Sequence, residues 1–304
     1  MKIGIAGAIR GGSGELDTKL QKARKSLLLF ARNPLSLIGL FVLLFFLGVT
    51  LLAPWLAPRD PLQLNHKAIL ISPGRQFILG TDEFGRDILS RVIYGARPSL
   101  GVALVVVIIA LGIGVPVGAL SGYIGKRVDE VVMRVADIFL AFPAFILAMA
   151  IAAALGPSLT SSMFAMAIVR WPVYARLIRG QTLMLKEMDF VTAAHCLGGR
   201  PSRVLRVHIL PSCAPILIVQ ATLDMGWVVI ATAGLSFVGF GAQPPLAEWG
   251  SMISNGRRFV TSAWWYTVFP GLALLLCAMG FNLLGDALME ILDPRLRSEF
   301  YGRT

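Results

Sequence analysis

Six long runs of apolar residues constrain the fold of this chain more than any other feature of its sequence. A helix needs roughly 20 mostly apolar residues to cross a lipid bilayer, and none of the six runs alternates as a membrane β-strand does. A composition of 56% hydrophobic and 15% charged residues supports a membrane protein. The sequence therefore predicts an all-α membrane protein with six transmembrane helices. They cover residues 33–54, 98–122, 128–155, 159–177, 216–240 and 266–292.

The predicted helices also set the domain boundaries. One connector, residues 178–208, is long, rich in Arg, and able to hold a short helix of its own outside the bilayer. The expected parts are an N-terminal tail over 1–32, a first transmembrane helix over 33–57, an outer loop over 58–97, a five-helix core over 98–292 and a C-terminal tail over 293–304.

The distribution of Lys and Arg predicts the orientation in the membrane. With the N-terminus in the cytoplasm, the inner segments carry more than twice as many Lys and Arg residues as the outer loops, in agreement with the positive-inside rule. The C-terminus is then cytoplasmic as well. The net charge of +11 follows mostly from this asymmetry, and residues 1–33 can also contact anionic lipid headgroups. We therefore expect membrane lipid and no nucleic acid among the partners.

No motif in this chain predicts catalysis or metal binding. The phosphate-binding pattern GxxxxGK[ST], the zinc pattern HExxH and the nucleophile pattern GxSxG are all absent. Cys196, Cys213 and Cys277 have no CxxC spacing, which argues against a disulfide or a zinc site. We expect no catalytic residue, no metal and no cofactor in this chain.

Two other classes of membrane protein stay open at this point. An intramembrane enzyme would need paired acids at one depth, and Asp137 and Asp224 could form such a pair, although their flanking residues give it no support. A secondary transporter would usually show internal repeats, and the six apolar runs show no convincing one.

Three patterns of charged or small residues within the apolar runs predict helix contacts. Asp224 lies in mid-helix without an obvious partner on its own helix, so it either faces a pathway or another subunit, or makes a structural hydrogen bond. Arg134 and Asp137 are spaced to pair with each other, or else extend separately toward the inner membrane surface. Glycines at 114, 118 and 122, with Gly112 nearby, predict a face that a second helix can approach closely.

The outer loop holds a dense set of glycines and charges between residues 79 and 91. The glycines suggest tight turns, and the charges are expected to form mutual ion pairs, worth about 0–1 kcal/mol each where exposed. Such a loop either braces an outer gate or contacts a partner or substrate. Its members are Gly80, Thr81, Asp82, Gly85, Arg86, Asp87 and Arg91.

Two motifs resemble one family of membrane proteins. Thr192-Ala193-Ala194, Gly198 and His208-Ile209-Leu210-Pro211 are similar to the cytoplasmic coupling loop of bacterial ABC-importer permeases, with Thr192 where that pattern has Glu and His208 where it has Ile. The segment 79–91 resembles the outer-loop signature of the "C" subunit of dipeptide, oligopeptide and nickel permeases. Glu248-Trp249-Gly250 and Asp293-Pro294-Arg295-Leu296 match further landmarks, so the resemblance extends over residues 25–298.

The resemblance implies a type I ABC-importer permease fold in a bacterial inner membrane, with the outer loop in the periplasm. The implied partners are a second homologous permease, two ATP-binding subunits that carry ATP and Mg, and a periplasmic or lipid-anchored binding protein. The implied cargo is a di- or oligopeptide or a peptide-like solute, and nickel or a metal chelate is the alternative.

The resemblance also implies that the connector docks on the ATP-binding subunit. Small side chains let a helix sit close inside a cleft, and Gly198 can end that helix in a left-handed turn. The residues expected to make this contact are Phe190, Thr192, Ala193, Ala194, Leu197, Gly198 and Arg203.

Overall fold

The computed structural model describes residues 30–31 and 33–292, and within that part the chain forms helices and loops but no strand. The all-α prediction is therefore confirmed for these residues, whereas most of the predicted N-terminal tail and all of the C-terminal tail lie outside them. The elements are α2 Pro34–Leu56, α3 Ile88–Ile124, α4 Lys126–Ala141, α5 Ala144–Leu155, α6 Leu159–Leu185, α7 Asp189–Cys196, α8 Pro201–Val204, the π-helix η1 Leu205–Ile209, α9 Leu210–Val238, α10 Trp249–Gly256, the 3-10 helix η2 Arg257–Phe259 and α11 Trp265–Leu292.

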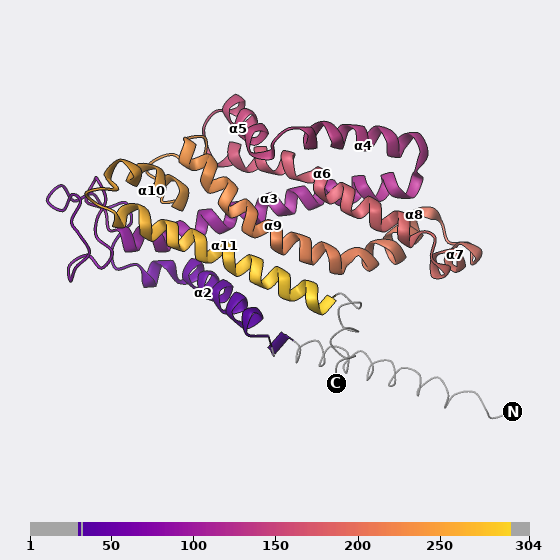
Figure 1. Ribbon diagram of the computed structural model, residues 1–304, viewed down its shortest axis with the longest axis horizontal. Helices are drawn as coiled ribbons and strands as arrows, with labels where there is room; N and C mark the ends of the chain where they lie inside the picture. The colour runs from indigo at the N-terminus through magenta and orange to yellow at the C-terminus, as the bar shows by residue number, and fades with distance from the viewer. Residues whose placement is uncertain (1–29, 32, 293–304) are drawn as a thin grey trace.

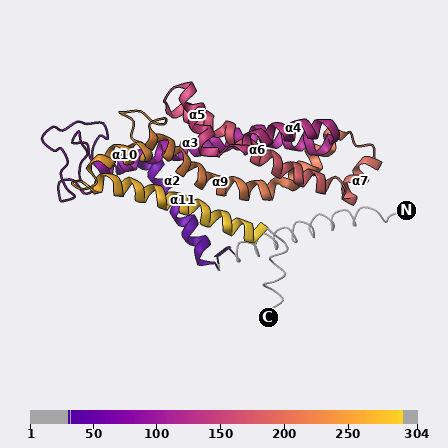
Figure 2. The same ribbon diagram turned by 45° about the horizontal axis from the view of Figure 1, so that its top comes forward.

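The long helices run side by side in an elongated bundle (Figure 1). Helix α10 and the loop between α2 and α3 lie at one end of the bundle, which we call the α10 end. Helices α7 and α8 lie at the opposite end, the α7 end. Helix α2 packs on α11, and the contact extends to the N-terminal part of α2, where a Cβ on Gly39 would lie 2.8 Å from Leu283; Figure 2 shows the bundle turned by 45°. The outer loop and the connector that holds α7 are thus separated by the full length of the bundle.

Four stretches of the described chain are long and apolar enough to cross a membrane: α2, α3, residues 201–238 and α11. The predicted single helix over 128–155 is wrong, because α4 and α5 meet at an angle of 90°. Pro143 causes the break: proline disfavours helical geometry in the residue before it, and Phe142 has φ −93° and ψ 144°. Taken as one broken span, α4 and α5 would make a fifth.

Helix α6 is the remaining predicted span, and it differs from the others in composition. It is 27 residues long, which corresponds to about 40 Å of helix. Its arginines at 170, 176 and 179 lower its mean hydropathy, and α6 is not among the four stretches that are long and apolar enough to cross a membrane. The bundle nevertheless places α6 beside α3 along most of its length (Figure 1).

Helix α3 begins at Ile88, ten residues before the start of the predicted span at residue 98. The Asp87 side chain accepts a hydrogen bond from the Ser90 backbone N–H at 2.8 Å, which is the usual way to satisfy a free donor at a helix start. Pro98 therefore lies inside the helix rather than at its start. The end of the predicted outer loop is shortened by the same ten residues.

The predicted glycine face of α3 packs on α6, as expected. A Cβ on Gly118 would lie 2.1 Å from the Ala175 carbonyl oxygen, and one on Gly114 would lie 2.5 Å from the Trp171 oxygen. Gly122 is similarly close to α6, whereas a Cβ on Gly112 would meet nothing within 4 Å. Only glycine allows the two backbones to approach this closely.

A polar contact joins α2 to α3 near the α10 end. Pro54 lies inside α2 and has no N–H to offer the carbonyl four residues earlier, that of Thr50. The Arg97 Nε of α3 donates to this Thr50 oxygen at 2.8 Å. At the opposite end of α2, the Asn33 side chain donates to Glu290 of α11 at 3.0 Å. These bonds supplement the apolar packing of α2 on the bundle.

Candidate functional site

Helix α7 is held at the tip of the α7 end by one buried residue and leaves its other face open. Val191 is 1% exposed and belongs to a buried apolar cluster with Ile178 of α6 and Ile209 of η1. Leu197, just after the helix, is 89% exposed, and Phe190 is 44% exposed. An apolar side chain this exposed is suited to contact with another protein surface.

Two glycines end α7 in a Schellman motif. The Gly199 N–H donates to the Ala194 oxygen at 3.0 Å, and the Gly198 N–H donates to the His195 oxygen at 2.9 Å. Gly198 has φ +79°, a conformation that side chains with a Cβ adopt at a cost. A Cβ on Gly199 would lie 2.6 Å from the Ala194 oxygen. The local backbone therefore requires glycine at 199 and, at 198, glycine or a residue that tolerates left-handed geometry.

The residues predicted for this connector lie around one hollow, with a single exception. The hollow has a volume of about 770 Å³. Thr192 does not line it, and its hydroxyl instead donates to the Met188 oxygen at 3.4 Å. Arg200, Val204 and His208 join the lining although the prediction did not include them. The predicted residues that line the hollow are Phe190, Ala193, Ala194, Leu197, Gly198 and Arg203.

One contact of α7 could not be foreseen from the sequence. The Tyr123 hydroxyl, at the end of α3, lies 3.0 Å from Nε2 of His195. These residues are 72 positions apart, and nothing in either local pattern indicates that they meet. This hydrogen bond and the burial of Val191 fix α7 to two different helices of the bundle.

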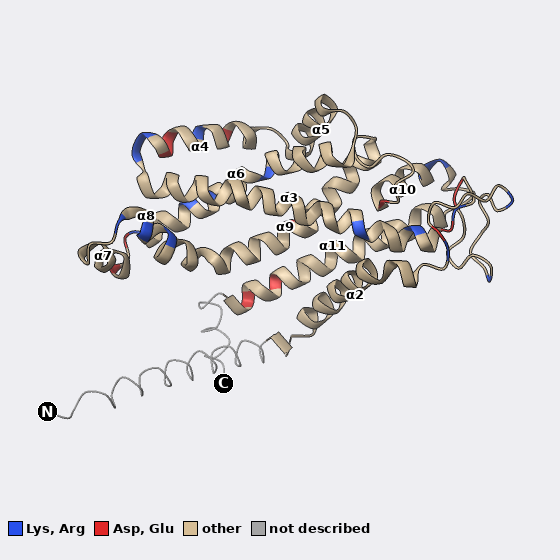
Figure 3. Cartoon of the chain, turned by 180° about the vertical axis from the view of Figure 1, so that it is seen from behind, with Lys and Arg blue, Asp and Glu red and all other residues tan. Residues whose placement is uncertain are grey.

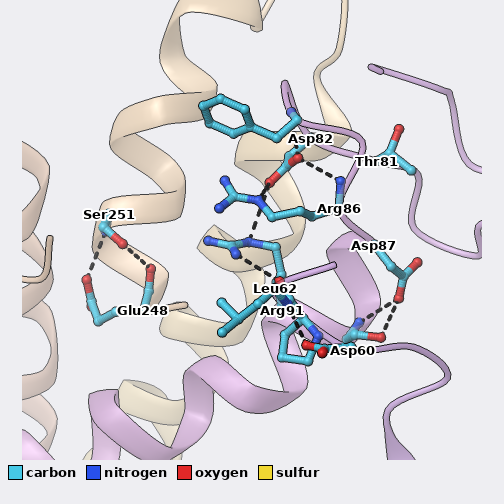
Figure 4. A network of polar contacts seen from close by, with 12 residues as sticks. Asp60, Leu62, Thr81, Asp82, Arg86, Asp87, Arg91, Glu248 and Ser251 are labelled. Carbon is cyan, nitrogen blue, oxygen red and sulfur yellow. Dashed lines mark hydrogen bonds and ion pairs between the residues drawn. The ribbon is translucent and has the colours of Figure 1, made fainter. Parts of the chain in front are cut away.

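At the α10 end, the predicted ion pairs of the outer loop are present but buried. Figure 4 shows the side chains of Arg86 and Arg91 on the same side of the Asp82 carboxylate. Arg86 Nε donates to Asp82 Oδ2 at 2.6 Å, and Arg91 Nε lies 3.5 Å from the same oxygen. All three side chains are at most 5% exposed. The expected ion pairs are thus present, and the value of about 0–1 kcal/mol for exposed pairs does not apply to them.

The other residues of this motif also hold the shape of the loop. The Thr81 hydroxyl donates to the Ala68 oxygen at 2.5 Å and accepts from the Ile71 N–H at 2.8 Å. Gly80 and Gly85 have φ of +79° and +73°. The first supplies a tight turn beside Trp265 of α11. At Gly85 a Cβ would lie 1.9 Å from the Asn65 oxygen. Every member of the motif has a structural contact in this chain.

Two acidic residues near this loop have perturbed pKa values. Burial raises the pKa of Glu83 above its usual value, the Asp82 carboxylate adds to the rise, and Arg86 and Arg258 oppose it. Burial also raises the pKa of Glu248. Glu248 caps α10 by accepting from the N–H groups of Gly250 and Ser251, both at 2.9 Å. These bonds oppose the rise.

Residues 248–250, the next landmark of the resemblance, are likewise packed against other helices. The Trp249 ring is fully buried, and its Nε1 donates to the Val92 oxygen of α3 at 3.0 Å. A Cβ on Gly250 would lie 2.3 Å from the Ala233 oxygen of α9. This segment therefore joins α10 to both α3 and α9. The landmark at 293–296 lies outside the described residues.

The charged residues within the bundle form pairs between helices. Arg134 and Asp137 do not pair with each other, because Arg134 faces Glu130 at 3.9 Å and Asp137 pairs with Arg176 of α6. Asp224 is 3% exposed. The predicted lack of a partner on its own helix is wrong, because Gln220 donates to Asp224 at 3.2 Å. Its principal partner is Arg170 of α6.

No group of three or more His, Cys, Asp or Glu side chains that could hold a metal ion occurs among residues 30–31 and 33–292. Cys196 is exposed, whereas Cys213 and Cys277 are buried, and all three are free thiols.

Comparison with known proteins gives consistent matches over most of the chain. The family described as binding-protein-dependent transport system inner membrane component matches residues 114–298, which is more than half of the sequence. The N-terminal TM domain of oligopeptide transport permease C matches residues 23–73.

Similar proteins include three transport system permeases. The chain is 46% identical to the probable D,D-dipeptide transport system permease protein DdpC of Escherichia coli K12, over 86% of this chain and 88% of that protein. It is 42% identical to the dipeptide permease DppC of Alkalihalophilus pseudofirmus, over 88% of each. It is also 42% identical to the di/tripeptide permease DppC of Pseudomonas aeruginosa, over 88% and 91%.

A chain of the MetNI methionine ABC transporter, solved in inward-facing conformations, has a similar fold. The TM-score is 0.55 at 19% sequence identity, and the match covers 68% of this chain and 98% of that one.

Proposed function

Because the chain belongs to the family of binding-protein-dependent transport system inner-membrane components, we propose that it is the permease subunit of an ATP-driven importer of di- or oligopeptides. Relatives at 42–46% identity are named as permeases of dipeptide and di/tripeptide systems. Their similarity extends over most of both chains, which supports a cargo of the same chemical class.

The open face at the α7 end is the observation that carries the coupling part of the proposal. In an ATP-driven importer, a permease without a phosphate-binding motif receives work from an ATP-binding partner. Helix α7 presents an exposed Leu197, the small side chains of Ala193 and Ala194, and a rigid glycine-ended turn around one hollow. We infer that an ATP-binding subunit occupies this hollow, so that ATP and Mg²⁺ are bound by the partner and not by this chain.

The proposed orientation places the α7 end in the cytoplasm and the α10 end in the periplasm of a bacterial inner membrane, with both termini cytoplasmic. The full complex then contains this chain, a second homologous permease, two ATP-binding subunits and a periplasmic or lipid-anchored binding protein. The outer loop lies at the end where that binding protein delivers its cargo. Its buried ion pairs keep a rigid shape for this contact.

Purification and uptake together test this function. The tagged chain is isolated from its native host in mild detergent, and the co-purifying complex is placed in liposomes with radiolabelled dipeptide, the binding protein and ATP. Uptake that requires ATP hydrolysis, and that excess unlabelled peptide but not nickel or a nickel chelate suppresses, is expected. A chain that purifies alone, or that carries peptide without ATP, would contradict the proposal.

A further inference from the structure

Three arginines of α6 are each held by an acid on a neighbouring helix. Arg176 and Arg179 pair with acids of α4, on one side of α6. Arg170 instead donates to Asp224 of α9, on another side. Helix α6 is thus tied by charge to both helices, in addition to its glycine-mediated packing on α3.

The pair of Arg170 and Asp224 is enclosed by one face of α9. The two side chains are 15% and 4% exposed. Gln220, one turn before the acid, donates to the same carboxylate oxygen at 3.2 Å. Trp227, almost one turn after it, lies under the guanidinium, with 4.5 Å between the Arg170 Cζ and the ring centroid. Arg170 therefore meets an acid and an aromatic ring on a single surface.

Helices α6 and α9 are the two arms of one hairpin, and α7 lies at its turn. At the α7 end the arms are joined by the buried cluster that includes Ile178, Val191 and Ile209. Over their whole lengths, α6 and α9 touch each other less extensively than α6 touches α3 or α9 touches α11, and beyond the α7 end they share a buried core with α3 and α5. The Arg170 pair lies about 22 Å along α6 from Leu185, so it connects the arms well beyond the cluster.

We propose that the Arg170–Asp224 pair is a positioning element that makes α6 and α9 move as one body when α7 is displaced. This inference rests on the proposed function, in which the ATP-binding subunit moves α7. Separating the two side chains would leave each charge buried without its partner, which is strongly unfavourable. The arms therefore keep their spacing at mid-bundle. Without the pair, the apolar packing of the shared core loses its directional bond between the arms, and movement of α7 is reduced before it reaches the middle of the membrane.

The test is the number of ATP molecules hydrolysed per peptide transported, measured in proteoliposomes. The double variant Arg170→Leu/Asp224→Leu replaces the buried pair with apolar side chains, a change that proteins often tolerate without loss of stability. We expect it to assemble and hydrolyse ATP at close to the wild-type rate. Peptide uptake is expected to fall about tenfold, within the usual range for coupling between sites, so that the ratio rises by the same factor.

A purely structural pair predicts a different result. If the pair only stabilises the fold, the complex that still assembles would hydrolyse ATP and take up peptide in the wild-type ratio. That unchanged ratio would overturn the inference. The matched control is Glu130→Ala/Arg134→Ala, which removes an exposed pair within α4 and should leave the ratio at the wild-type value. Should the double-leucine variant fail to assemble, the ratio is measured on Asp224→Asn, and an unchanged ratio there overturns the inference as well. Absence of ATP-driven uptake by the wild-type complex would instead count against the proposed function.

Discussion

At the scale of single residues, the outer loop shows why side-chain type alone was a good guide to structure and a poor guide to environment. The residues of segment 79–91 were correctly expected to form turns and ion pairs. Their burial was not predictable, because the segment packs against a distant helix: the Trp265 Nε1 of α11 donates to the Thr81 oxygen at 3.2 Å, 184 positions away. A single sequence carries no signal for such a distant contact.

The raised pKa of Glu83 predicts a pH-dependent gain of stability on replacement by Gln. The unfolded value is about 4.5, so below that pH the side chain is protonated in both states and burial carries no electrostatic penalty. As the pH rises from this value toward the higher folded one, the unfolded state loses its proton first, so the wild type is progressively destabilised until the penalty is complete above the folded value. The melting temperature of Glu83→Gln in detergent should exceed that of the wild type at pH 7, and the difference should vanish toward about pH 4.

Asp60→Asn serves as the control for Glu83→Gln. Asp60 lies in the same loop, is exposed, and accepts from the Leu62 N–H, a bond that Asn retains. The control loses the same charge without relieving a buried carboxylate, so it should not reproduce the stabilisation. A Glu83→Gln variant less stable than the wild type at pH 7 would mean that attraction to Arg86 and Arg258 outweighs burial.

At the scale of helices, periodic patterns were predictive and breaks in long helices were not. The glycine spacing of α3 predicted its close packing correctly, because helix periodicity alone places those residues on one face. Hydropathy did not reveal the bend between α4 and α5, since both pieces are apolar enough to sum to one span. Pro143 was the available signal. Pro98 had the opposite outcome, because it lies inside α3 and not at its start.

The glycine face of α3 supplies a matched pair of substitutions. Gly118→Ala places a methyl group against the Ala175 carbonyl of α6 and should destabilise the protein by about 1–3 kcal/mol through overpacking. Gly112→Ala, on the same helix, meets nothing within 4 Å. It should be neutral or stabilising by about 0.5–1 kcal/mol, since alanine favours helix more than glycine does. Denaturant unfolding in detergent measures both, and equal effects at the two positions would refute the assigned packing.

The turn that ends α7 gives a prediction about coupling. Gly198 has φ +79°, and a Cβ at this position would meet nothing within 4 Å, so the limit is conformational and not steric. Gly198→Val should distort the turn, abolish co-purification of the ATP-binding subunit and stop uptake, while the chain still inserts into the membrane. Gly198→Asn should retain most of the activity, because Asn tolerates left-handed geometry. Unaltered uptake by the valine variant would refute this role for the turn.

At the scale of the whole molecule, charge is sorted along the bundle. Figure 3 shows Lys, Arg, Asp and Glu mainly toward the two ends and along α4, with long uncharged stretches between them. The connector and the outer loop were predicted to lie on opposite sides of a membrane, and the structure separates them by the length of the bundle. The pairing of Arg170 with Asp224 could not be predicted, because 54 residues separate them and neither local pattern identifies the other.

Thiol labelling tests the orientation of the whole chain. Starting from Cys196→Ser, which removes the exposed natural thiol, a single cysteine is introduced either at Arg75 in the outer loop or at Arg127 at the start of α4, both exposed. A membrane-impermeant maleimide should label Arg75→Cys in right-side-out spheroplasts and Arg127→Cys only after permeabilisation. The reverse pattern would invert the proposed topology.

The arginines of α6 have a consequence for biogenesis. Each arginine at the centre of a helix costs about 2.5–3.5 kcal/mol on insertion scales, so α6 enters lipid poorly by itself. The acids that pair with Arg176 and Arg179 are on α4, which is synthesised earlier, whereas Asp224 follows later. Helix α6 can thus leave the translocon already partnered by α4 and α3, whereas Arg170 can pair with Asp224 only after α9 has been synthesised. Synthesis order and charge pairing together give the bundle a preferred sequence of assembly.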